Sequence, residues 1–196
     1  TVDYPLYYAI NAVLAQANGP TSQIEDHYNA IPAYYDTNAW YRLVTFLDNH
    51  DNVRFLSPGK ANNDTNRLVV ALEFLYTSRG IPCLYYGTEQ AFNGGSDPYD
   101  REDMFAGQFE QGPSLGDNFG ETHPLFQLVA KLNNFRRLYP SLRRGGHNNL
   151  WSDAYGPGLF AYSRVFSNEE AIVVFNTANS TLTLTNCPTT YPAGTV

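Results

Sequence analysis

Lysine and long apolar runs are scarce in this 196-residue sequence. Lys60 and Lys131 are its only lysines, and its formal net charge is −7 at pH 7. Proteins that bind nucleic acid need a basic face that displaces the counterions of the phosphates, so this composition argues against a nucleic-acid partner. No apolar run has the length needed to cross a membrane, and we expect no membrane partner.

Cysteine is also rare, because Cys83 and Cys187 are the only two. They are too few and too far apart for a metal cluster or a disulfide-rich scaffold. Cys83 lies in an apolar segment and is predicted to be a buried thiol, whereas Cys187 is either free or separated from a partner further along a longer chain. The sequons that start at Asn63 and Asn179 favour a secreted, extracellular protein.

Hydrophobic residues make up 43% of the sequence, which is enough for a sizeable core. Apolar spacing and breakers predict helices at residues 6–17, from about 21, at 67–79 and at 124–139, and buried strands at 43–47 and 81–86. After residue 140 the pattern changes to short β-type runs at 150–151, 158–167, 170–177 and 181–186. We therefore expect an α/β part at 1–140 and an antiparallel β part at 141–196. The opening residues 1–5 resemble the end of a strand that enters a turn, since Tyr4 precedes a proline.

Polar residues crowd the end of the first predicted strand, in the stretch LVTFLDNHDNVRF at 43–55. In parallel α/β folds, the loops after the carboxyl ends of the strands form the active face. His50 and Asp51 are the candidate functional residues here. The alternative is that the loop is buried and that its Asp, Asn and His side chains satisfy its own hydrogen bonds.

A second polar cluster, at 92–103, follows the strand predicted at 81–86. Two glycines and a proline favour tight turns, and Asp97 and Arg101 are placed to form a charge-assisted pair at the rim of a cleft. The alternative is a solvated surface loop. Both clusters occupy the same end of neighbouring strands, which favours a shared site.

These two stretches carry a resemblance to a known family. LVTFLDNHDNVRF is similar to the seventh-strand motif of α-amylase family glycoside hydrolases, and GIPCLYYGTEQAFNGGSDPYDRE resembles their eighth-strand motif in its fungal and related secreted form. Residues 2–8 resemble the exit of the sixth strand. The resemblance implies the C-terminal part of a (β/α)8 TIM barrel, strands six to eight and the final helix, at 1–140. It implies an antiparallel β-sandwich domain at 141–196, and we expect this domain to be cut short because residues 191–196 offer no closing strand.

The resemblance also implies roles for individual residues. Asp51 corresponds to the carboxylate that stabilises the transition state, and His50 to a histidine that holds the sugar at the cleavage subsite. Asp97 and Arg101 correspond to residues that bind glucose units on the non-reducing side of the cut. Arg54 has no role from the resemblance; because it lies close to Asp51 in the same loop, we expect it either to orient Asp51 or to be a surface arginine.

The implied activity is hydrolysis of internal α-1,4-glucosidic bonds in starch-like α-glucans by a retaining, double-displacement mechanism. The alternatives are a transglycosylase or α-glucosidase of the same family, or a non-catalytic carbohydrate-binding remnant. The family's nucleophilic aspartate and acid glutamate have no counterpart here, so residues 1–196 are expected to be an inactive C-terminal fragment. About three quarters of a barrel of roughly 250 residues would precede them. We expect a monomer with no metal or other cofactor within this chain, and a calcium ion in the full-length parent.

Overall fold

The computed structural model describes residues 1–105, 116–192 and 194 of the chain. Its helical elements are α1 (Tyr4–Ile10), the π-helical turn η1 (Asn11–Ala15), α2 (Ser22–Ala30), the 3-10 turn η2 (Ile31–Ala33), α3 (Thr65–Thr77), the 3-10 turn η3 (Thr88–Gln90), α4 (Pro124–Leu138) and α5 (Pro140–Arg144). Its strands are β1 (Val44–Phe46), β2 (Ile81–Cys83), β3 (Gly146–Ser152), β4 (Leu159–Phe166) and β5 (Glu169–Asn176). In the part described, no helix is long and apolar enough to cross a membrane.

Strands β1 and β2 are parallel neighbours, and the start of the chain lies beside β1. Val44 pairs with Ile81 across the two strands, and Val2 forms an isolated parallel bridge to Val44. Helices fill the connections, as in βαβ units. Gly80 lets α3 turn directly into β2, because its φ is +114° and a Cβ there would lie 2.6 Å from Cγ2 of Thr45.

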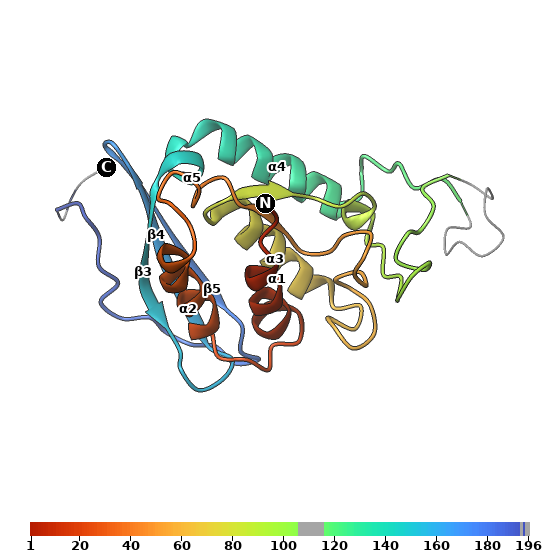
Figure 1. Cartoon of the computed structure of the whole chain (residues 1–196), viewed down its shortest axis with the longest axis horizontal. Coiled ribbons are helices and arrows are strands. Elements are labelled where there is room, and N and C mark those ends of the chain that lie inside the picture. The colour runs from red at the N-terminus through yellow and green to blue at the C-terminus, as the bar shows by residue number, and fades with distance from the viewer. Residues whose placement is uncertain (106–115, 193, 195–196) are drawn as a thin grey trace.

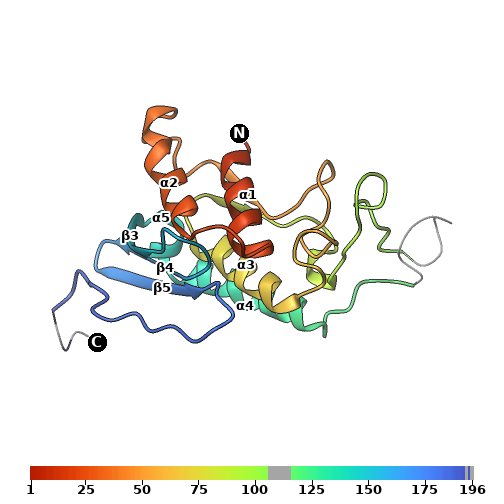
Figure 2. The same cartoon turned by 90° about the horizontal axis from the view of Figure 1, so that it is seen from below.

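Strands β3, β4 and β5 form a separate antiparallel sheet in that order. Figures 1 and 2 both place this sheet at one end of the molecule and the loops that follow β1 and β2 at the other, with α1, α3 and α4 between them. Phe160, Tyr162 and Phe175 of the sheet pack against Phe74 of α3, with ring centroids 6.1 to 6.4 Å apart. One hydrophobic core therefore runs from the helices into the sheet.

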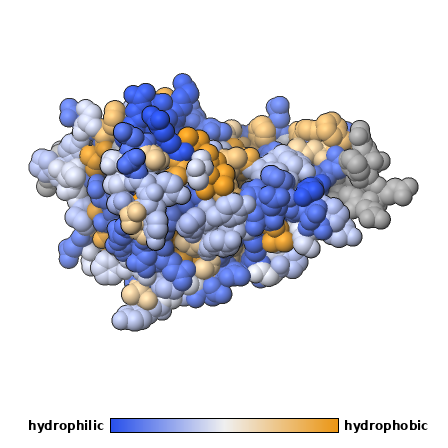
Figure 3. Space-filling model, viewed as in Figure 1, coloured by the Kyte–Doolittle hydropathy of each residue, from blue (hydrophilic) through white to orange (hydrophobic). Residues whose placement is uncertain are grey.

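The strand predicted at 81–86 is shorter and more exposed than expected. It ends at Cys83, and Ile81 is 48% exposed, so the prediction of a strand covered on both faces is wrong. Cys83 is an exposed free thiol, not a buried one. The reason is that β2 pairs only with β1 in the described residues, which leaves apolar surface open over this strand pair (Figure 3).

Two further predictions differ from the structure. Tyr4 begins α1 instead of entering a turn, because the Asp3 side chain caps the helix by accepting the Leu6 amide at 3.1 Å. The segment 181–185 forms no strand, since it has no hydrogen-bonded neighbour among the described strands. The structure describes one three-stranded sheet after residue 145, and the β-sandwich stays a prediction.

Candidate functional site

The polar residues after β1 divide into a buried set and an exposed set. Asp48 is only 2% exposed, and its carboxylate accepts hydrogen bonds from the Phe55 amide at 3.0 Å and the Thr88 hydroxyl at 3.1 Å. Because Thr88 follows β2, Asp48 ties the two strand ends together. Burial raises the pKa of the Asp48 carboxyl, and the two hydrogen bonds and the nearby Arg54 oppose this rise.

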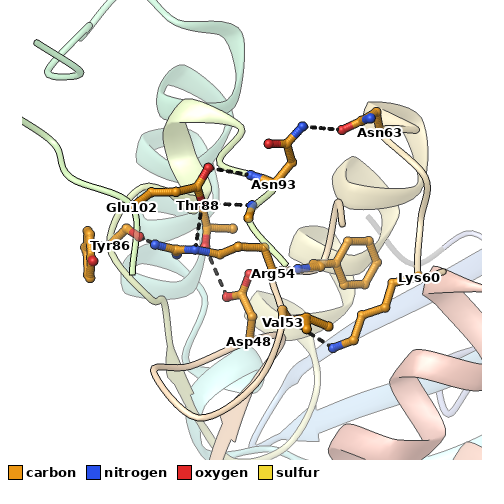
Figure 4. Close-up of polar contacts among 11 residues, drawn as sticks. Asp48, Val53, Arg54, Lys60, Asn63, Tyr86, Thr88, Asn93 and Glu102 are labelled. Carbon is orange, nitrogen blue, oxygen red and sulfur yellow. Dashed lines mark hydrogen bonds and ion pairs between the residues drawn. The ribbon is translucent and has the colours of Figure 1, made fainter. Parts of the chain in front are cut away.

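Arg54 is fully buried beneath the second loop (Figure 4). Its Nε lies 3.2 Å from Oε2 of Glu102, its Nη1 donates to the Tyr86 carbonyl at 2.6 Å, and its Cζ lies 4.0 Å from the Tyr85 ring centroid. These partners brace the loop after β2. The prediction of a surface arginine is wrong, and the guanidinium is engaged by Glu102 instead of orienting Asp51.

Glu102 holds the turn that precedes it. Its carboxylate accepts the amides of Asn93 at 3.1 Å and Gly94 at 3.0 Å, and the Gly94 carbonyl accepts the Arg54 amide at 3.1 Å. A Cβ on residue 94 would lie 1.7 Å from the Tyr99 carbonyl oxygen, so this close approach requires glycine. Burial raises the pKa of the Glu102 carboxyl, while the two amides and Arg54 lower it.

Two asparagines shape the exposed tip of the first loop. The side-chain oxygen of Asn49 accepts the Asp51 amide at 2.9 Å and the Asn52 side-chain amide at 2.8 Å. Both asparagines also donate to the Tyr4 hydroxyl, at 3.3 and 3.4 Å. The tip is thus a side-chain-stabilised turn fastened to α1, and it directs Asp51 outward.

Lys60 fastens the other end of the same loop. Its ammonium donates to the Tyr7 hydroxyl at 2.7 Å and to the Val53 carbonyl at 3.1 Å. The Tyr7 hydroxyl donates onward to the Asn52 side chain at 3.0 Å. Burial lowers the pKa of Lys60 to about 8, and the distant Asp48 charge only partly offsets this.

The four residues predicted to bind substrate come together on the exposed edge. His50 and Asp51 are 68% and 60% exposed, with Nε2 and Oδ2 3.5 Å apart. Arg101 pairs with Asp97 through Nη1 and Oδ1 at 3.3 Å, which confirms the predicted pair. The Nε of Arg101 also donates to the His50 carbonyl at 3.0 Å. This bond joins the two loops, so all four side chains belong to one surface.

A hollow of about 490 Å³ lies beside this surface. Arg101, Tyr86, Phe105 and Phe119 contribute to its lining, and the rings of Phe105 and Phe119 meet edge to face at 5.0 Å. Both phenylalanines are 53% exposed. Exposed aromatic rings beside charged side chains can pack on the apolar faces of sugar rings while the polar groups bind hydroxyls.

Sequence reasoning did not identify the buried supports Asp48, Lys60 and Glu102. Asp48 and Glu102 stand within the two quoted motifs, but composition does not tell which acids face inward. Asn49 could have been found from the sequence, because an asparagine side chain often accepts the backbone amide two residues further along, here that of Asp51. Among the described residues, no group of three or more His, Cys, Asp or Glu side chains could hold a metal ion.

The chain matches the model of a known protein family. The model of the α-amylase catalytic domain matches residues 1–118. The chain belongs to the α-amylase family. This confirms the family resemblance seen in the two motifs, both of which lie within the matched range.

Relatives of the α-amylase family extend the match beyond residue 118. A β/α-amylase of Paenibacillus polymyxa is 36% identical over 191 residues, covering 94% of this chain and 14% of its own length. A cyclomaltodextrin glucanotransferase of Bacillus sp. (strain 1-1) is 34% identical over 151 residues, covering 77% of this chain and 19% of its own length. The chain therefore spans less than a quarter of these curated relatives.

Solved structures of α-amylase family (β/α)8-barrel enzymes also match the fold. An Anoxybacillus α-amylase has a TM-score of 0.72 and 30% identity, and it covers 90% of this chain and 35% of its own. The γ-CGTase of alkalophilic Bacillus clarkii has a TM-score of 0.78 and 28% identity, with 98% and 26% covered. The parallel segments β1 and β2 thus belong to a barrel fold.

Proposed function

We propose that the full-length protein hydrolyses internal α-1,4-glucosidic bonds of starch-like α-glucans by a retaining mechanism. The observation that carries this proposal is the single exposed surface formed by His50, Asp51, Asp97 and Arg101 in a chain of the α-amylase family. Two loops from different parts of the sequence meet there, and the Arg101–His50 bond fixes their relation.

The chemistry suits these side chains. The transition state of glycoside cleavage has oxocarbenium character, and hydrogen bonds to the sugar hydroxyls strengthen as it forms. Asp51 would stabilise that positive charge and grip the sugar, with His50 on a neighbouring hydroxyl. Arg101 and Asp97 would hold the preceding glucose units, and the hollow lined by Phe105 and Phe119 would continue the path of the glucan.

Double displacement also needs a nucleophile and a general acid. Their family motifs have no counterpart in residues 1–196, so we expect this chain alone to bind glucan weakly and not to turn it over. We infer that the expected calcium ion is held by other parts of the full-length protein. The sequons at Asn63 and Asn179 support secretion, and we infer a monomer.

The substitution Asp51→Asn in the full-length protein tests the role of Asp51. We expect kcat on soluble starch to fall at least about a hundredfold, because a preorganised charge is lost from the transition state. Stability should change by less than about 0.5 kcal/mol, since the side chain is 60% exposed. Asp26→Asn, at an exposed position of α2, is the matched control and should leave kcat unchanged. A near-native rate for the Asp51 variant would refute its role.

Transglycosylation is the second candidate, and the glucanotransferase relatives favour it. Both reactions share a glycosyl-enzyme intermediate and differ in whether water or a sugar hydroxyl attacks it. Product analysis with starch, maltotriose and sucrose separates them. Shortened linear products support hydrolysis, whereas exclusive formation of transfer products rejects the hydrolase assignment.

A non-catalytic carbohydrate-binding remnant is the alternative outside enzymes. The sequence that precedes residue 1 in the gene distinguishes it. In that preceding sequence we expect an aspartate and a glutamate in the family's fourth- and fifth-strand motifs, because Asp51 cannot carry out double displacement without a nucleophile and a general acid. A gene without those motifs would eliminate catalysis.

A further inference from the structure

A polar cavity lies on the far side of the molecule from the proposed active surface. It has a volume of about 230 Å³ and opens between α2, the segment that follows it, and β3. Figures 1 and 2 both place α2 and β3 at the end opposite the loops after β1 and β2. Arg79, His147, Asn149, Tyr28 and Trp40 line it, and we call it the Arg79 cavity.

Arg79 is a buried cation that lies over aromatic rings but has no hydrogen-bonding or acidic partner among the described residues. It is 6% exposed, yet its guanidinium makes no hydrogen bond or ion pair within residues 1–105, 116–192 and 194. The other buried arginines are held: Arg54 by Glu102, and Arg136 and Arg164 by backbone carbonyls. Buried charges in proteins are normally paired, and Arg79, unlike Arg54, has no acid against its guanidinium among the described residues.

Within the described residues, the atoms of Arg79 that are buried without a hydrogen-bond partner are Nε and Nη2. In a planar guanidinium these two nitrogens share one edge and present parallel N–H groups, the geometry that binds a carboxylate or phosphate with two hydrogen bonds. In Arg54 this edge bears Nε, which lies 3.2 Å from the Glu102 carboxylate. In Arg79 no acid of the described residues lies against the same edge.

The cavity walls add further unused groups. Both ring nitrogens of His147 and the side-chain oxygen of Asn149 are shielded from solvent and have no hydrogen-bond partner in the part of the chain that the structure describes. Burial, and then the charges of Arg164 and Arg79, lower the pKa of His147, so its ring is neutral with one N–H donor. The one acid on the wall, Glu25, is already bonded to the Ser152 hydroxyl.

We propose that the Arg79 cavity binds a small molecule that carries a carboxylate or phosphate group, with the oxyanion on the Nε–Nη2 edge of Arg79. The volume is several times the roughly 30 Å³ of one water molecule, which leaves room for an oxyanion and a short organic body. The rings of Tyr28 and Trp40, with centroids 4.8 and 5.5 Å from Cζ of Arg79, hold the guanidinium in place by cation–π contacts and also line the cavity. His147 donates to the same oxyanion.

Tryptophan fluorescence of the 196-residue chain tests this proposal, because Trp40 lines the cavity and Trp151 is the only other tryptophan in this chain. In a Trp151→Phe background, inorganic phosphate and acetate are titrated at constant ionic strength against chloride. We expect a saturable change in Trp40 emission with at least one of them. Arg79→Gln should weaken that binding at least tenfold, and Arg144→Gln, at an exposed arginine of α5, should not alter it.

Three results would overturn the proposal. They are no saturation with either anion, an equal response in the Arg79→Gln protein, and saturation by maltose alone, which would indicate a neutral sugar site. If Arg79→Gln does not fold, Arg79→Lys serves, because lysine keeps the charge but loses the two-pronged edge. We then expect several-fold weaker binding, and unchanged affinity would count against the site.

Discussion

Glu102 and Asp97 are acids of one loop, and each pairs with an arginine, but burial makes their contributions differ. The Glu102 carboxylate is 4% exposed and faces the fully buried Arg54, whereas Asp97 is 62% exposed. Removing one partner of a buried pair leaves the other charge uncompensated. We expect Glu102→Gln to lower the free energy of unfolding by about 3–5 kcal/mol. Asp97→Asn, the matched control, should cost less than about 1 kcal/mol.

Urea unfolding followed by circular dichroism measures both changes. Similar losses for the two variants would show that Arg54 does not depend on Glu102. Glu102 is one of several acids at 97–103, and nothing in the local sequence distinguishes it from the others. Its ion pair with Arg54 forms only when the two loops fold against each other. The motif therefore predicted the exposed residues of the candidate site, while the buried residues that support them could be found only in the structure.

Lys60 makes stability depend on pH in the alkaline range. Its pKa is about 8 in the folded protein, against an ordinary value of 10.5. Between these values the unfolded chain binds more protons than the folded one, so the free energy of unfolding should rise with pH. Buried tyrosines such as Tyr162, whose pKa is raised, act in the opposite direction above about pH 10.

The comparison of wild type with Lys60→Met at pH 7.5, 8.5 and 9.5 isolates this effect. The wild type should gain stability relative to the variant as the pH rises, because Lys60 loses its proton and no longer buries a positive charge. Urea unfolding at each pH provides the free energies. Parallel curves for the two proteins would mean that Lys60 keeps its ordinary pKa.

At the scale of elements, α3 depends on its first residues. The Asp64 side chain accepts the amides of Asn66 at 3.0 Å and Arg67 at 3.3 Å, which otherwise lack helical partners. We expect Asp64→Ala to cost about 1 kcal/mol of stability. Asp64→Asn keeps the cap, because asparagine caps equally well, and should cost less. Thermal unfolding measures both, and equal losses would point to the charge instead of the cap.

Sequence signals predicted the helices α3 and α4 and the strands β4 and β5 to within two residues, but they failed for the run at 181–186. The 124–139 helix matches α4 (Pro124–Leu138) closely, because caps and three-to-four spacing act within a few residues. The run at 181–186 has strand-like alternation, yet 181–185 is not a strand. Strand formation depends on a neighbour, which local sequence does not specify. Likewise, Cys83 lies in an apolar run but on an uncovered strand.

At the scale of the whole molecule, one hydrophobic core extends across the domain boundary predicted near residue 140. Phe160 of β4 is 1% exposed and packs on Phe74 of α3, and Arg164 of β4 donates to the Thr77 carbonyl at 2.8 Å. Elements from both sides of residue 140 therefore stabilise each other. This coupling predicts that residues 1–140 and 141–196 unfold together.

The tryptophans report on this coupling separately, since Trp40 lies before residue 140 and Trp151 after it. In Trp151→Phe and Trp40→Phe proteins, urea unfolding should give the same midpoint by fluorescence. Phe160→Ala should lower the free energy of unfolding by about 3–5 kcal/mol, because it opens a cavity in the shared core. Both urea midpoints should therefore fall together. Phe135→Ala, at a position 38% exposed, is the control and should cost less. If only the Trp151 signal shifts in the Phe160 variant, the sheet unfolds on its own and the two parts are independent domains.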